Sequence, residues 1–127
     1  MIESALGFVR EELDKIGVPY EFMRWTSSTK PNRYWIGEYS VTPTNTEDGY
    51  KEFTLLLTGT TQDLWSVLMQ DRAKIEDHFP NIGGLSKTTE DGVVVIFYEN
   101  DFPVPTGEAD LKRLQINLRI KAWKGMK

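Results

Sequence analysis

Apolar and polar residues follow helical and strand periods along most of the chain. At its start an apolar residue recurs at every third or fourth position: Ile2, Leu6, Val9, Leu13 and Ile16. This spacing places one apolar stripe along an amphipathic helix. Gly17 directly follows the stripe and Pro19 prevents a restart, so the sequence predicts a first helix that ends at residue 16.

The next segment predicts two strands and a surface arm. Residues 20–25 and 33–41 are rich in aromatic and apolar side chains, and residues 26–32 between them are polar. We expect these strands to form a hairpin with a long exposed loop. Residues 42–49 contain no large apolar side chain and include an Asp-Gly turn signal, so we expect an arm on the surface of the protein.

A second helix is predicted in the middle of the chain. Residues 53–58 alternate in strand fashion, and apolar residues then recur at near-helical spacing over residues 61–79. Thr60 and Asp63 match a capping box at the start of this helix, and Pro80 stops it.

The last part of the chain predicts two strands. Residues 83–87 follow the second helix and predict a plain loop, because Gly83-Gly84 lacks the frame of a phosphate-binding loop. Residues 93–98 are apolar on both faces, which is typical of a strand inside a sheet. Residues 113–122 alternate strictly, so one face of the sheet is expected to be wet.

The element order α-β-β-β-α-β-β predicts an α+β fold. We expect a two-layer domain in which two helices pack on one face of a mainly antiparallel sheet. The chain has 127 residues and shows no internal repeat and no linker, so residues 1–127 are expected to form a single domain.

Composition excludes several kinds of chemistry. The chain contains no cysteine and a single histidine, which rules out disulfides, thiolate catalysis and any site within one chain that needs two histidines. Its apolar runs are too short to span a bilayer, and its first residues do not resemble a secretory signal. We therefore expect intracellular synthesis and no membrane association.

Candidate catalytic residues are few. His78 is expected at the end of the second helix, where an imidazole can interact with the last carbonyls. The acidic pairs do not have the spacing of a calcium loop and are expected to be solvated turn residues: Glu47-Asp48, Glu90-Asp91, and Glu99 with Asp101. The sequence therefore predicts no enzyme activity, no metal site and no cofactor.

Charge is distributed unevenly along the chain. Residues 1–111 contain nine Lys and Arg against nineteen Asp and Glu, whereas residues 112–127 contain six basic residues and no acidic one. This basic segment either binds phosphate or complements an acidic surface of the same chain or a neighbour, and we favour the second interpretation. Some aromatic rings of the predicted hairpin must point away from the core, which favours a protein partner or self-association.

Several stretches together resemble small tail proteins of long-tailed bacteriophages and prophages. The stretches are the leading helix, residues 18–25, residues 34–39, and residues 53–58 running into Gly59-Thr60-Thr61. The chain is most similar to the tail-terminator family, whose members complete the tail and join it to the head. This resemblance rests on length, element order and general sequence character over most of the chain.

The resemblance implies an α+β subunit without cofactor or active site. It implies a homo-oligomeric ring, commonly a hexamer, that contacts the tail-tube protein and the head-connector protein, with no specific nucleic-acid recognition. Such a protein would be found in the host bacterial cytoplasm during assembly and then in the virion tail. From the residue pattern, our candidates for the oligomer interface are Tyr34, Trp35, Thr44, Asn45, Glu47, Asp48, Arg119, Lys121 and Trp123.

Two other function classes stay open. A monomeric binding module or small enzyme would have a pocket between helix and sheet, lined by Tyr20, Trp25 or Trp65. A nucleic-acid binder would use the basic residues near the end of the chain: Lys112, Arg113, Arg119, Lys121, Lys124 and Lys127.

Overall fold

The computed structural model describes residues 2–26, 31–41, 50–90 and 92–124. Within these ranges the chain forms two helices and six strands in the order α-β-β-β-α-β-β-β. The elements are α1 (Ile2–Lys15), β1 (Tyr20–Phe22), β2 (Arg33–Val41), β3 (Tyr50–Thr61), α2 (Trp65–His78), β4 (Leu85–Thr89), β5 (Gly92–Pro103) and β6 (Lys112–Lys124).

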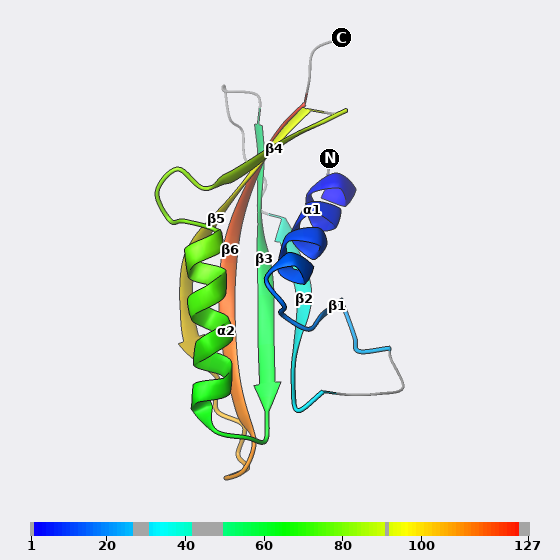
Figure 1. Ribbon diagram of the computed structural model, residues 1–127. Coiled ribbons are helices and arrows are strands. Elements are labelled where there is room, and N and C mark those ends of the chain that lie inside the picture. Colours follow the sequence, from blue (N-terminus) through cyan, green and yellow to red (C-terminus); the bar gives the residue numbers. More distant parts are fainter. Residues whose placement is uncertain (1, 27–30, 42–49, 91, 125–127) are drawn as a thin grey trace.

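The strands form one sheet in the order β1-β2-β3-β6-β5-β4. All neighbours are antiparallel except β1 and β2, which are parallel. Both helices lie on the same face of the sheet, with α1 near β1 and α2 over β3 and β6 (Figure 1). The predicted two-layer α+β fold is confirmed.

Strand β6 lies in the middle of the sheet and supplies much of the core. Its alternating apolar residues are all buried: Leu114, Ile116, Leu118, Ile120 and Ala122. Val9 and Leu13 from α1 and Leu68 and Ile75 from α2 pack into the same core. The polar side chains of β6 lie on the opposite face, because successive side chains of a strand point to opposite faces. Neither of the two described helices covers that face.

The end of α1 follows the sequence signal. Gly17 takes a left-handed conformation at φ +75°, which a residue with a Cβ rarely adopts. Its N–H donates to the carbonyl of Asp14, and the N–H of Val18 donates to that of Leu13 at 3.0 Å. These bonds satisfy carbonyls that the last helical turn leaves open, so Gly17 ends the helix as predicted.

The predicted hairpin between residues 20–25 and 33–41 is wrong. Strand β1 has three residues and runs parallel to β2, with Tyr20 opposite Trp35 and Phe22 opposite Gly37. Met23 ends the strand because its φ of +70° leaves the extended region. The two strands are separated by residues 23–32, and parallel neighbours need such a longer connection instead of a tight hairpin turn.

The predicted start of the second helix is also wrong. Helix α2 begins at Trp65, and Thr60 and Thr61 belong to β3 because they pair with strands on both sides. The expected capping box does not form: Leu64 is the N-cap residue and has no side-chain cap bond. Instead, the Thr61 hydroxyl accepts a bond from the N–H of Asp63 at 3.0 Å, which turns the chain out of the sheet.

Three strands extend beyond the sequence prediction. Residues 85–89 are strand β4 rather than a loop, and they pair with β5 from Gly92 to Ile96. This strand was missed because it contains only one large apolar residue, Leu85. Strands β3 and β5 each have twelve residues, and β5 continues past an irregularity at Glu99 in its pairing with β6.

Candidate functional site

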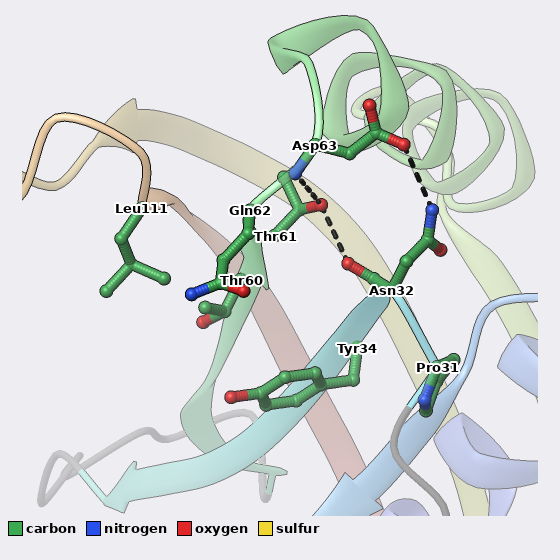
Figure 2. Close-up of a pocket in the computed structure, with 8 residues that line it drawn as sticks. All are labelled: Pro31, Asn32, Tyr34, Thr60, Thr61, Gln62, Asp63 and Leu111. Atoms are coloured by element: carbon green, nitrogen blue, oxygen red, sulfur yellow. Dashed lines mark hydrogen bonds between the residues drawn. The ribbon is translucent and has the colours of Figure 1, made fainter.

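A cleft of about 410 Å³ opens where β2 begins and β3 ends. Figure 2 shows its lining: Pro31, Asn32, Tyr34, Thr60, Thr61, Gln62, Asp63 and Leu111. Half of these residues come from the turn before β2 and from the turn between β3 and α2, and the others come from the ends of β2 and β3 and from the residue before β6. The cleft therefore lies at the end of the sheet, not between a helix and the sheet.

Hydrogen bonds within the cleft tie the two turns together. The side-chain amide of Asn32 donates to Oδ2 of Asp63 at 3.1 Å, and the Thr61 hydroxyl donates to the carbonyl of Asn32 at 2.8 Å. Oδ1 of Asp63 accepts a bond from the N–H of Leu64 at 2.7 Å. Both oxygens of this carboxylate are thus engaged at the start of α2.

The cleft can offer hydrogen bonds and one aromatic ring to a small molecule. Tyr34, Thr60, Gln62 and Leu111 surround the part of the cleft away from the Asn32–Asp63 bond (Figure 2). Nucleophilic catalysis needs a nucleophile within hydrogen-bond reach of a base, and general acid–base catalysis needs a titratable group that is free to exchange a proton. The residues that line this cleft contain no such pair, and its one carboxylate holds the local structure.

A second polar cluster is buried between α2 and β2. Asp71 on α2 is 1% exposed, and its Oδ2 accepts bonds from Nε of Arg33 at 2.8 Å and from Nε1 of Trp35 at 2.9 Å. Arg33 also donates to the carbonyl of Gly17 at 3.2 Å. Oδ1 of Asp71 is buried with no partner among the described residues. The cluster fastens α2 and the end of α1 to the sheet.

A third cluster joins the two helices. Glu12 on α1 is 6% exposed, and its carboxylate lies 2.7 Å from Nζ of Lys15 and 2.9 Å from Nε2 of His78. Burial acts to raise the pKa of Glu12, but the bonds and charges of Lys15 and His78 outweigh burial and hold the pKa below its ordinary value of 4.5. His78 thus pairs with the other helix, whereas we expected it to contact the carbonyls of its own.

A fourth cluster connects α2 to β5. The hydroxyl of Tyr98 donates to Oδ2 of Asp101, and Nε of Arg72 donates to the same oxygen at 2.8 Å. Arg72 also bonds Glu76 one turn further along α2 at 3.1 Å. Burial and the Asp101 carboxylate raise the pKa of the Tyr98 phenol well above its ordinary value, so it stays protonated.

The basic candidates of β6 lie on the face of the sheet opposite the helices, which we call the open face. The guanidinium of Arg119 lies 5.0 Å from the centre of the Phe97 ring and 3.8 Å from the Glu52 carboxylate. Lys121 lies over the rings of Tyr50 and Phe97, and the Trp123 ring lies 5.1 Å from that of Tyr50. Because β6 is central in the sheet, none of these residues lies at a sheet edge.

The remaining interface candidates have different outcomes. Tyr34 lies on the open face and lines the end-of-sheet cleft. Trp35 is fully buried and bonds Asp71, so the folded subunit cannot offer it to a partner, and this candidate is wrong. Its ring lies against Gly59, the residue opposite it on β3. The arm candidates lie outside the described residues: Thr44, Asn45, Glu47 and Asp48.

The sequence analysis missed the buried role of Asp71, and it expected exposed rings within residues 20–41 without identifying the side chains that form a patch. Asp71 occupies a position of the buried stripe of α2, three residues after Leu68 and four before Ile75. An acidic residue at such a position was the signal in the sequence that could have indicated a buried polar contact. The patch is a group of exposed apolar side chains at the β1–β2 side of the sheet, which we call the edge cluster: Phe22, Met23, Tyr39 and Val41.

Comparison with models of known protein families found no match, and a search of curated proteins found no similar sequence. In the part of the chain that the structure describes, no group of three or more His, Asp or Glu side chains is placed to hold a metal ion. Neither helix is long and apolar enough to cross a membrane, again for the described residues.

Proposed function

We propose that this chain is a structural tail subunit of a long-tailed bacteriophage or prophage. Copies of it would assemble head to tail as a ring, of six subunits as in the tail-terminator family it resembles, that ends the tail tube and joins it to the head connector. Assembly would take place in the host bacterial cytoplasm, and the ring would stay in the virion tail.

The observation that supports a ring best is the presence of two unlike apolar patches on different sides of the subunit. The edge cluster has side chains that are 38–61% exposed. A second group at the start of α2, which we call the α2 cluster, consists of the N-cap residue Leu64 with Trp65 and Met69, and its side chains are 40–68% exposed. Figure 1 shows α2 and β1 at opposite sides of the helical face. A head-to-tail contact joins two different surfaces, and it closes into a ring when the rotation between subunits allows it.

The buried polar clusters also favour a structural role. Asp71, Glu12 and Asp101 each bond side chains of their own subunit and connect one element to another. Carboxylates used in this way stabilise a fixed arrangement of helices on the sheet. Such an arrangement suits a subunit whose task is to present rigid surfaces.

The test is the mass of the purified protein by light scattering, followed by addition to assembled tail tubes. We expect a discrete multiple of the 14.6 kDa chain and rings at tube ends in electron micrographs. Leu64→Lys with Met69→Lys should weaken assembly, whereas Ile82→Lys, at a position 89% exposed outside both clusters, should not. A single-chain mass at all concentrations together with bare tube ends would contradict the proposal.

The second candidate is a binding module for a small molecule. The end-of-sheet cleft has a volume within the usual range for ligand sites, and Tyr20 lines two cavities beside α1 of about 320 and 160 Å³. A metabolite that raises the melting temperature of a monomeric protein, and does so less with Tyr20→Ala or Gln62→Ala, would favour this function.

A further inference from the structure

Part of strand β2 is open on one side. Strand β1 pairs only with Trp35, Ile36 and Gly37, whereas residues 38–41 pair with β3 on their other side. Among the described residues, no strand covers the outer side of residues 38–41. The backbone of residues 38–41 therefore forms an open edge of the sheet on the side away from β3.

The hydrogen-bonding groups of this edge belong to Tyr39 and Val41. The N–H of Trp35 donates to Pro19, and the carbonyl of Gly37 accepts from Met23, both at 2.8 Å. Backbone groups of alternate residues point to the same side of a strand. The N–H and C=O groups of Tyr39 and Val41 thus continue this row into the open side.

The side chains at this edge do not protect it. Natural sheets block open edges with lysine, proline, bulges or a covering segment. Residues 38–41 are Glu-Tyr-Ser-Val, and Tyr39 and Val41 are 43% and 49% exposed. Phe22 stacks on Tyr39 at 6.1 Å, which extends the apolar surface beside the open backbone. An incoming strand would find both backbone partners and an apolar contact.

The same chain provides a strand that fits. Among the described strands, β4 forms the opposite edge of the sheet and pairs with β5 alone. Following the pairings across the sheet, β4 runs in the same direction as β2, and Leu85 lies on the same row as Val41. A rotation about an axis along the strands therefore brings β4 of a second copy beside β2, parallel to it and with the same face outward.

We propose that the open edge at residues 38–41 receives strand β4 of a second copy, so that the sheet continues from one subunit to the next. This inference rests on the proposed ring and names the backbone that closes it. An extended segment of a different protein would be the other possible occupant, and the experiment separates the two.

Proline substitutions test each edge separately. Val41→Pro removes an outward N–H from β2, and by the same alternation across the sheet Thr88→Pro removes one from β4. Proline is tolerated where the N–H faces away from the sheet, so the fold should persist in circular dichroism. Each variant alone should be a single chain in light scattering, with subunit affinity at least tenfold weaker. Val41→Thr and Thr88→Val keep the N–H groups and should assemble like the wild type.

Mixing the two proline variants gives the sharpest test. Val41→Pro keeps an intact β4 edge and Thr88→Pro keeps an intact β2 edge, so a mixture should form a two-chain species that neither variant forms alone. Should a proline variant unfold, Tyr39→Lys with Val41→Lys tests the β2 edge with every N–H group retained. Ile82→Lys is its matched control.

The outcomes separate this inference from the proposed function. Wild-type mass for both proline variants would overturn the edge contact and leave the ring standing. Disruption by Val41→Pro alone, with no two-chain species in the mixture, would show that something other than β4 occupies the edge. A wild-type protein that stays a single chain and leaves tube ends bare would overturn both.

Discussion

Replacing Asp71 by alanine should destabilise the subunit strongly. The carboxylate is 1% exposed and accepts bonds from Arg33 at 2.8 Å and Trp35 at 2.9 Å. Asp71→Ala removes the oxygen that accepts both bonds and opens a small void between α2 and β2. The donating side chains of Arg33 and Trp35 stay in place, and the loss of folding free energy depends on whether each finds another partner.

The two donors differ in how easily water can replace the carboxylate. The indole N–H of Trp35 is buried, so leaving it without a partner costs about 1–3 kcal/mol. The Arg33 side chain is 26% exposed and keeps its bond to the carbonyl of Gly17, so it can be partly hydrated. Breaking a fully buried ion pair costs about 3–5 kcal/mol, and the partial exposure of Arg33 places this variant near the lower limit, at about 3 kcal/mol. For a domain of this size, that corresponds to a melting temperature lower by roughly 10 °C.

Urea unfolding followed by circular dichroism gives the free energy directly. Asp71→Asn keeps one acceptor oxygen and should cost about 1–2 kcal/mol, because hydrogen bonds to neutral groups are weaker. A double-mutant cycle with Arg33→Ala should return a coupling of about 1–3 kcal/mol between the two residues. An Asp71→Ala protein within about 0.5 kcal/mol of the wild type would refute the view that this cluster fastens α2 to the sheet.

Three further predictions follow from other contacts. The pKa of Glu12 is lowered in the folded protein, so its contribution to stability is present above pH 4.5 and is lost as the pH falls through the folded pKa. The urea midpoint should therefore fall less between pH 7 and pH 3 for Glu12→Gln than for the wild type. Gly59→Ala would place a Cβ 2.6 Å from the Trp35 ring and should cost about 1–3 kcal/mol in the same assay, while an unchanged midpoint would mean that the ring shifts freely. Arg119→Gln with Lys121→Gln should change stability by less than about 1 kcal/mol because both side chains are solvent-accessible, and a ring closed through its sheet edges should keep its mass in light scattering.

Elements whose signal is local could be predicted from the sequence. Helix α1 has a complete apolar stripe and a glycine end, and β6 alternates over its whole length, so each was predicted close to its observed limits. The layer arrangement followed because both helices have one apolar side. The start of α2 failed because pairing on both sides holds Thr60 and Thr61 in the sheet, which a local capping pattern cannot reveal.

Pairing partners depend on contacts between distant segments, and the sequence does not specify them. Residues 20–25 and 33–41 have the composition of strands, but nothing in either segment distinguishes a parallel from an antiparallel neighbour. The same limit applies to β4, whose pairing with β5 outweighs its low apolar content. The buried role of Asp71 likewise depends on Arg33 and Trp35, which lie 38 and 36 residues away in the chain.

Whether an apolar strand position becomes buried depends on how far the helical layer reaches. Tyr39 and Val41 lie opposite Leu55 and Phe53 on the helical face, and those two partners are fully or almost fully buried. Their position on this face predicts burial for Tyr39 and Val41 as well, but β1 ends at Phe22 and the described helices leave Tyr39 and Val41 about half exposed. The isolated subunit does not bury Tyr39 and Val41. A second subunit that covered this part of the sheet would account for their apolar character. For this reason the open edge of β2, rather than the charged central strand, is where we expect subunits to meet.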